Sequence, residues 1–163
     1  MAKRKIYWDT TVFLCFLNKK EADRRAICED ILRHGQVDDV VLYTSTFTIV
    51  EVVRPKHMKG VKLTPPQISA IGRMFQWRWL RKIDLDQRVA NRAVELSRDY
   101  GLAPADSIHA ASAIVWNLDV LQCWDRDFSK VSSLIPIEQP QQISTQRELG
   151  NWKDPIGPAP EDF

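Results

Sequence analysis

Short apolar runs alternate with helix-forming segments along most of this 163-residue chain. The runs are rich in β-branched and aromatic residues, as short buried strands are. They are "KIYW", "DVVLYTS", "LRKIDL", "DVLQCW" and "LIPI". Strands that are separated by helices pair in parallel and are covered on both faces. The alternation therefore predicts an α/β fold built on a mostly parallel central sheet of about four or five strands.

The segments between these runs have helical periodicity and recognisable ends. The expected helices are "TVFLCFL", "EADRRAICEDILRHG", "FTIVEVVR", the stretch from Pro66 to about Trp79, "QRVANRAVELSRDYG" and "ADSIHAASAIVWN". Gly35 and Gly101 should end the second and fifth of these helices, and Pro104 should open the sixth. We expect the second helix to bury Ala22, Ala26, Ile27, Ile31 and Leu32. In the strand "LRKIDL" we expect the side chains of Leu80, Ile83 and Leu85 to point into the core.

Size and composition favour one globular domain followed by a tail. Hydrophobic residues make up 44% and charged residues 27%, which excludes disorder throughout the chain. A formal net charge of +2 gives the whole molecule no strong attraction to nucleic acid or anionic lipid, so such binding would need local patches. From about Gln139 aliphatic residues become scarce and prolines frequent, so we predict a domain over residues 1–138 and a Pro-rich C-terminal tail over residues 139–163.

The cysteines and the N-terminal region exclude several other classes. Cys15, Cys28 and Cys123 form no Cys-x-x-Cys pair and have no regular spacing with the histidines, so we expect core packing instead of a zinc site or a disulfide framework. Asp9 interrupts the N-terminal region before a signal-peptide core can form, and no apolar run approaches the ~18 residues that span a bilayer. We therefore expect a cytoplasmic protein with no membrane partner.

Four acidic residues stand where the predicted fold could gather them. Asp9 and Asp125 follow strand-like runs, and the carboxyl ends of parallel strands meet at one edge of a sheet, where ligands bind. Glu51 interrupts the apolar helix "FTIVEVV", and Asp106 lies in the first turn of the helix that continues as "IHAASAIV". Four carboxylates brought together repel one another unless they are protonated or bridged by cations. Hard oxygen ligands of this kind suit Mg²⁺ or Mn²⁺.

Each acid also has a simpler interpretation when it is taken singly. Asp9 and Asp125 could be turn residues that end strands. Glu51 could form an ordinary ion pair with Arg54, three residues further along the helix. Asp106 could have no role beyond a favourable interaction with the dipole of the helix that it opens. The residues alone leave these alternatives open.

The order and spacing of four segments resemble the PIN domain family, nearest to the VapC-type toxin ribonucleases. The segments are "YWDTTVF", "TSTFTIVEVVR", "LAPADSIHAASAI" and "CWDRDF", and the resemblance runs from about Lys5 to Ile137. It implies a three-layer α/β/α fold, metal-dependent hydrolysis of single-stranded RNA, frequent homodimers and often an antitoxin partner. It also implies that the catalytic and metal-ligating residues are Asp9, Glu51, Asp106 and Asp125.

Further residues beside these motifs could contribute to the site. Thr10 and Thr11 resemble the hydroxyl residues that commonly follow the first acid in the family. Asp127 could add an outer-sphere contact, although we prefer its interpretation as the cap of the short helix "FSKV". His109 shares a side of its helix with Asp106; it could hydrogen-bond in the site, although we prefer a satisfied core histidine.

One position departs from the family pattern. Members usually carry Thr or Ser two residues before the fourth acid, where this chain has Cys123, followed by the bulky Trp124. A thiol hydrogen-bonds more weakly than a hydroxyl, so activity could be reduced or directed to another substrate. The alternative function is therefore a catalytically weak or inactive member that binds RNA or protein. A haloacid-dehalogenase-type phosphotransferase is excluded because it needs an aspartate where this chain has Thr11.

Two basic stretches could hold a nucleic acid. The candidate RNA-binding residues of "RPKHMKGVK", which follows the helix bearing Glu51, are Arg54, Lys56, Lys59 and Lys62. "MFQWRWLRK" interleaves aromatic residues with cations, which permits base stacking, but we prefer that its tryptophans fill the core. The same surface could accept an antitoxin helix. The expected chemistry is phosphodiester hydrolysis by an activated water, in which Glu51 ligates a second ion or accepts the proton of the water.

Overall fold

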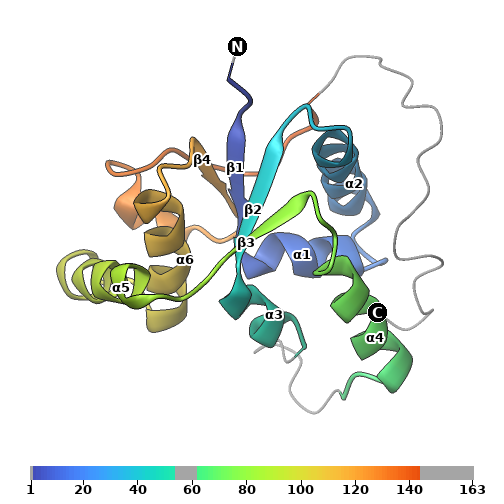
Figure 1. Ribbon diagram of the computed structural model, residues 1–163, viewed down its shortest axis with the longest axis horizontal. Coiled ribbons are helices and arrows are strands. Elements are labelled where there is room, and N and C mark those ends of the chain that lie inside the picture. Colours follow the sequence, from blue (N-terminus) through green and yellow to red (C-terminus); the bar gives the residue numbers. More distant parts are fainter. Residues whose placement is uncertain (1, 54–61, 144–163) are drawn as a thin grey trace.

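A five-stranded parallel sheet runs through the centre of the molecule (Figure 1). The structure is a computed structural model that describes residues 2–53 and 62–143. The strands lie in the order β3-β2-β1-β4-β5, and every neighbouring pair is parallel. Their bounds are β1 Lys5–Trp8, β2 Val41–Ser45, β3 Leu80–Ile83, β4 Val120–Gln122 and β5 Ile137–Glu138. The predicted parallel sheet is confirmed.

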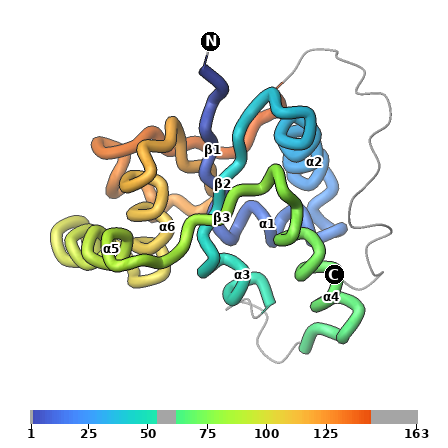
Figure 2. Tube along the Cα trace, viewed as in Figure 1, coloured from blue at the N-terminus to red at the C-terminus, as the bar shows by residue number. Residues whose placement is uncertain are grey.

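Helices cover both faces of this sheet, which makes the fold a three-layer α/β/α sandwich. The helices are α1 Thr10–Leu17, α2 Ala22–Gln36, α3 Thr46–Val53, α4 Pro65–Met74, α5 Gln87–Tyr100 and α6 Pro104–Val115, with a short 3-10 helix η1 at Asp127–Val131. In Figures 1 and 2, α5 and α6 lie on one side of the sheet and α1, α2 and α4 on the other. The chain enters α3 from the carboxyl end of β2, below the sheet in these views.

Each central strand contributes side chains to two separate hydrophobic cores. Ile6 and Trp8 of β1 pack with α1, α2 and α4, while Tyr7 between them packs with α5 and α6. All three side chains are fully buried. Successive side chains of a strand point to opposite faces, so a sheet that is covered twice needs continuous apolar runs instead of an alternating pattern. This explains the unbroken apolar runs "IYW" in β1 and "VLY" in β2.

Several local predictions are confirmed. Gly101 ends α5 with a left-handed φ of 68°, a conformation that glycine adopts without steric cost. Pro104 is the first residue of α6, where its missing N–H is not needed. The cysteines are free and buried, as core packing requires; they are Cys15, Cys28 and Cys123.

The predicted end of α2 at Gly35 is wrong, because the helix continues through this residue. A Cβ atom at Gly35 would lie 2.8 Å from Leu42 Cδ1, so the glycine allows α2 to approach β2 closely. The predicted burial of Ala22 and Ala26 is also wrong, since both are exposed in the first turns of the helix. The buried face is formed instead by Cys28, Ile31, Leu32, His34 and Gly35.

The region after α4 also differs from the prediction. α4 ends at Met74, and Trp77 and Trp79 lie in the turn that follows, with their rings stacked at 4.8 Å and an angle of 18°. Both rings pack against the core on the α1–α2 side, which is the interpretation we preferred for this stretch. Leu85 is 43% exposed and does not point inward, because β3 ends two residues earlier, at Ile83.

Only the first residues of the predicted tail belong to the described part of the chain. Pro140 is buried, and the backbone N–H of Ile143 donates to Asp30 Oδ2 of α2 at 2.9 Å. The remainder of the tail lies outside the described residues, so the domain boundary at residue 139 stays a prediction. Over residues 2–53 and 62–143, the helices are too short or too polar to cross a membrane.

Candidate metal centre

The direction in which the chain winds reverses between β1 and β4. β1 pairs with β2 on one side and with β4 on the other, so the segments that leave β1 and β4 start side by side at the carboxyl edge of the sheet. Asp9 follows β1 and Asp125 follows β4. The backbone N–H of Trp124 donates to Thr11 Oγ1 at 3.2 Å, which ties the two segments together. Such an edge is where a parallel α/β sheet binds its ligand.

Asp9 is the N-cap residue of α1 and lies almost fully buried. Its Oδ1 accepts hydrogen bonds from the hydroxyl of Thr11 at 2.6 Å and from the backbone N–H of Val12 at 3.3 Å. Burial raises the pKa of Asp9 from 3.8 to about 6; the charge of Asp106 adds to this effect, while His109 and the two hydrogen bonds oppose it. A nearby cation would favour the charged form of this carboxyl group.

Three further aspartates converge beside this edge of the sheet. Asp106 lies in the first turn of α6, Asp125 follows β4, and Asp127 opens η1. One carboxylate oxygen from each of the three lies within 4.8 Å of the other two. Asp125 and Asp127 are exposed and Asp106 is half-buried, so solvent ions can reach them. We call these three residues the aspartate cluster.

The aspartate cluster suits a hard divalent cation. Carboxylate oxygens are the donors that Mg²⁺ and Mn²⁺ prefer. Two oxygens that share one Mg²⁺ ion at ~2.1 Å lie at most ~4.2 Å apart. The separations of up to 4.8 Å therefore need only small side-chain adjustments, or a water molecule between the ion and one carboxylate. The residues present fit such an ion.

Glu51 lies on α3 and is not a member of the aspartate cluster. Its Oε2 accepts a hydrogen bond of 2.5 Å from the hydroxyl of Thr10 and lies 2.6 Å from His109 Nε2. The opposite ring nitrogen of His109, Nδ1, lies 2.8 Å from the hydroxyl of Tyr7. We call Glu51, Thr10, His109 and Tyr7 the Glu51 network. The network surrounds the acid with side chains from β1, α1 and α6, whereas the local partner considered for it, Arg54, lies outside the described residues.

The predicted site residues are thus divided between two groups. Asp106 and Asp125 lie together, Asp9 lies near enough to Asp106 to respond to its charge, and Glu51 belongs to the neighbouring network. The preferred interpretation of Asp127 as a helix cap is wrong, since it is the first residue of η1, which has Arg126 as its N-cap, and its own backbone N–H donates to Asp125 Oδ1 at 2.9 Å. Its carboxylate joins the aspartate cluster instead.

His109 and Tyr7 show what the sequence could and could not reveal. His109 is 2% exposed, with both ring nitrogens in contact with hydrogen-bonding groups, as a core histidine requires. It also contacts a predicted site acid, so the two interpretations weighed for it are compatible. Tyr7 was missed, because an aromatic residue within a strand predicts core packing alone. Its position two residues before Asp9 was the only available signal.

Cys123 occupies the position where a hydroxyl residue is usual in the family. It is 2% exposed, and its Sγ donates to the backbone carbonyl of Asp125 at 3.3 Å. Burial raises the pKa of the Cys123 thiol, and the charges of Asp9 and Asp125 raise it further. The thiol therefore stays protonated and acts as a weak donor that helps to shape the segment bearing Asp125. The guanidinium carbon of Arg24 lies 4.7 Å from the ring centroid of the adjacent Trp124.

The basic stretch proposed for RNA binding is only partly described. Lys62 is exposed at its end, two residues before the capping residue Thr64 of α4. The other candidates, Arg54, Lys56 and Lys59, lie outside the described residues. Their contact with a nucleic acid stays a prediction.

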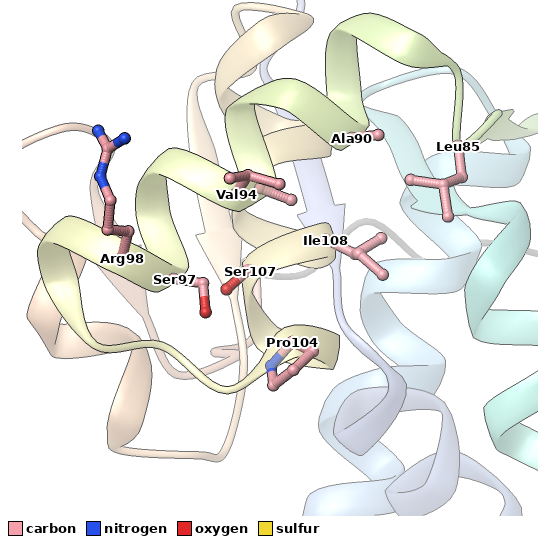
Figure 3. A pocket seen from close by; sticks show the side chains of 9 residues that line it. Leu85, Ala90, Val94, Ser97, Arg98, Pro104, Ser107 and Ile108 are labelled. Atoms are coloured by element: carbon pink, nitrogen blue, oxygen red, sulfur yellow. The ribbon is translucent and has the colours of Figure 1, made fainter.

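A concave region between α5 and α6 differs in character from the acidic edge (Figure 3). This α5–α6 pocket has a volume of about 600 Å³. Its described lining consists of Leu85, Ala90, Ala93, Val94, Ser97, Arg98, Pro104, Ser107 and Ile108. The lining contains neither an acid nor a histidine among the residues that the structure describes. The pocket therefore offers no ligand set for a hard cation.

Comparison with known proteins agrees with this fold. A sequence model of the PIN domain matches residues 6–134. A chain of a toxin–antitoxin complex from Klebsiella pneumoniae is 20% identical, with a TM-score of 0.59 over 85% of this chain and 99% of that chain. A chain from the structure of VapBC2 from Rickettsia felis, bound to a DNA fragment from the VapBC2 promoter, is 16% identical. Its TM-score is 0.61, over 83% of this chain and 98% of that chain. At these identities the two structures show the fold alone. No curated protein matches the chain.

Proposed function

The chain belongs to the PIN domain family, and we propose that it is a metal-dependent endoribonuclease that hydrolyses phosphodiester bonds of single-stranded RNA, as a VapC-like toxin. The observation that carries this proposal is the aspartate cluster beside the buried Asp9, at the edge of the sheet where ligands bind. Acids that crowd one another in this way are stabilised by a cation. A cation at this position could act on a phosphate group.

The chain's own residues divide the work of the proposed reaction. Bound Mg²⁺ or Mn²⁺ would activate a water molecule and neutralise the charge that builds on the phosphate. Asp9, Asp106 and Asp125 would hold the ion, directly or through water, and Asp127 would assist them. Glu51 would accept the proton of the attacking water or ligate a second ion. The reaction needs no side-chain nucleophile.

Substrate binding would come from local positive charge, since the net charge of the chain is only +2. We assign the phosphate contacts to the basic stretch that follows α3, the helix bearing Glu51. The residues in question are Arg54, Lys56, Lys59 and Lys62. Each lysine or arginine that contacts a phosphate should make binding weaker at higher salt.

The proposal includes a protein partner. One similar structure is described as a toxin–antitoxin complex, and the other as VapBC2 with promoter DNA. Both support an antitoxin that binds this chain. A homodimer and a cytoplasmic location, expected from the resemblance and from the sequence, remain predictions.

The proposed activity is tested with the purified full chain and a mixed pool of end-labelled RNA. We expect cleavage with Mg²⁺ or Mn²⁺, loss of cleavage with a chelator, and loss in the Asp106→Asn variant. A duplex of the same RNA should resist cleavage if the substrate is single-stranded. Divalent-ion binding without any cleavage would overturn the enzymatic proposal in favour of an inactive binding module.

A further inference from the structure

We propose that His109 is a positioning residue for Glu51. In this proposal the N–H at Nε2 holds the carboxylate in one orientation, while Tyr7 holds the opposite nitrogen of the ring. The inference rests on the proposed function, since it assumes that Glu51 acts in the site. It adds a role for two buried side chains beyond the four predicted acids.

Glu51 and the two side chains that orient it come from three different elements. The carboxylate is carried by α3, the hydroxyl of Thr10 by α1, and the imidazole of His109 by α6. Thr10 Oγ1 and His109 Nε2 lie 2.5 and 2.6 Å from the same oxygen, Glu51 Oε2. Hydrogen bonds of this length to a charged acceptor are strong and directional. The carboxylate is therefore oriented relative to α1 and α6, not only by its own helix.

Thr10 Oγ1, His109 Nε2 and Glu51 Oε2 lie within hydrogen-bonding distance of one another, and the protons available to them show which atoms donate. Thr10 has one hydroxyl proton, which it donates to Glu51 Oε2. His109 Nε2 also lies 3.2 Å from Thr10 Oγ1, so this nitrogen faces two oxygens. With Glu51 ionised, a bare nitrogen would place its lone pair against the carboxylate, whereas an N–H satisfies both contacts. A proton therefore belongs on Nε2.

The second ring nitrogen is held from inside the sheet. Tyr7 is fully buried in β1, the central strand, and its hydroxyl lies 2.8 Å from His109 Nδ1. Burial raises the pKa of this hydroxyl, so it keeps its proton and can donate it to Nδ1. The rings of Tyr7 and Phe47 lie 5.9 Å from the imidazole, at angles of 61° and 52°. Both hydrogen bonds and packing therefore select one orientation of the ring.

A core histidine needs hydrogen-bonding partners, but one partner of His109 is a carboxylate that reaches the surface. The side chain of Glu51 is 20% exposed, whereas that of His109 is 2% exposed. The network thus connects the rigid centre of the sheet to an acid that solvent and substrate can reach. Partners that orient an acting group in this way typically change metal affinity or activity by about 10–100-fold when they are removed.

Two substitutions of His109 separate positioning from simple core packing. In His109→Gln the amide nitrogen can take the place of Nε2 and still donate to Glu51, whereas the shorter side chain of His109→Asn reaches only as far as Nδ1. Both place an amide in a site built for a ring, so thermal unfolding should change similarly in both. We expect His109→Gln to keep Mn²⁺ affinity and kcat within about threefold of the wild-type values. We expect His109→Asn to lose about 10–100-fold in Mn²⁺ affinity or in kcat, while KM changes little.

A spectroscopic measurement tests the hydrogen-bond assignment without any substrate. In the metal-free full chain labelled with ¹⁵N at histidine, the proton of His109 should be found on Nε2. Tyr7→Phe removes only the hydroxyl at Nδ1, so it should shift the resonance of that nitrogen while the protein stays folded. A proton on Nδ1 that points to Tyr7, with Nε2 bare, would contradict the proposal.

The results distinguish this inference from the proposed function. Equal losses in His109→Gln and His109→Asn, or unchanged Mn²⁺ affinity and kcat in His109→Asn, overturn the positioning role even if the wild-type protein cleaves RNA. If the wild-type protein cleaves no RNA but the two variants still differ in Mn²⁺ affinity, the nuclease proposal fails and the positioning role stands. A wild-type protein that neither binds Mn²⁺ nor cleaves RNA overturns both.

Discussion

The aspartate cluster and the Glu51 network lie on neighbouring elements, yet they hold acidic groups in opposite ways. In the aspartate cluster, carboxylates from α6, η1 and the segment after β4 face one another within 4.8 Å, and two of the three residues are exposed. In the Glu51 network, the carboxylate faces a hydroxyl and an imidazole, and the residues that supply them are buried.

This difference indicates which acids depend on a ligand. Like charges that crowd one another raise the free energy of the folded protein until a cation binds. An acid that accepts hydrogen bonds from the protein is stabilised whether or not a ligand is present. Substitutions in the aspartate cluster should therefore weaken metal binding without destabilising the fold, whereas substitutions in the Glu51 network should affect both.

The largest effect is expected for Asp9→Asn, which removes a charge next to the cluster. Asparagine can still cap α1, so the fold should persist while cleavage falls by roughly 100-fold or more. The RNA cleavage assay with Mn²⁺ measures this loss. Cleavage at the wild-type rate would remove Asp9 from the site.

The same variant tests the effect of burying Asp9 on stability. The pKa of Asp9 is raised from 3.8 in a model peptide to about 6 in the fold, so the folded protein binds this proton more tightly than the unfolded chain does. The free energy of unfolding therefore has its full value below pH 3.8 and decreases as pH rises through 6. Metal-free Asp9→Asn should therefore be more stable than the wild-type protein at pH 8, on the order of 3 kcal/mol, and equally stable near pH 3.5. Urea unfolding at the two pH values measures the difference, and a constant difference would contradict it.

A smaller effect is expected for Asp106→Asn, compared with Asp99→Asn as a matched control. Asp106 belongs to the aspartate cluster, so its loss should weaken Mn²⁺ binding by about 10–100-fold while stability without metal stays the same or rises. Asp99 is an exposed acid on α5 that pairs with Arg98, and its substitution should leave Mn²⁺ affinity unchanged. Calorimetric titration with Mn²⁺ compares the two. Equal affinities would remove Asp106 from the metal centre.

Cys123→Ser should have a modest effect in the opposite direction. A hydroxyl donates a stronger hydrogen bond than a thiol to the carbonyl of Asp125, and a gain of about 0.5–1 kcal/mol corresponds to a roughly two- to fivefold increase in Mn²⁺ affinity or kcat. Cys28→Ser is the control, because Cys28 is equally buried but bonds weakly to Val12 in the other core. The prediction is contradicted if both variants behave alike.

The smallest effect is expected in the α5–α6 pocket. Val94 is 63% exposed and lies in an apolar lining without acids among the described residues. Val94→Ser should change stability by less than about 0.5 kcal/mol and leave Mn²⁺ affinity and cleavage within about twofold. A large loss of cleavage would show that this pocket is coupled to the acidic edge, and that the two regions are not independent.

Much of the fold followed from local patterns. Continuous apolar runs between helical segments predicted a parallel sheet, and Gly101 and Pro104 marked helix ends, because each of these signals depends on nearby backbone conformation alone. Gly35 carried the same kind of signal and was misread. Its role is the close contact of α2 with Leu42, a residue on β2 that no local pattern connects to it.

The candidate site could be predicted less completely, for the same physical reason. That Asp9 and Asp125 would lie at one edge followed from parallel pairing. The local partner considered for Glu51 was Arg54, but the described partners are Thr10 and His109, which come from two other helices. Asp127 had the local features of a cap, and only its distance from Asp106 and Asp125 shows another environment.

The sequence by itself determined the order of strands and helices along the chain, the burial of both faces of the sheet, and the presence of acids at strand ends. These features arise from hydrophobic periodicity and backbone preference, which act over a few residues. The tertiary structure decided which acids face one another and which acid is held by a histidine and a threonine. Such contacts depend on the packing of α1, α3 and α6 around the end of the sheet, where a shift of an ångström makes or breaks a hydrogen bond.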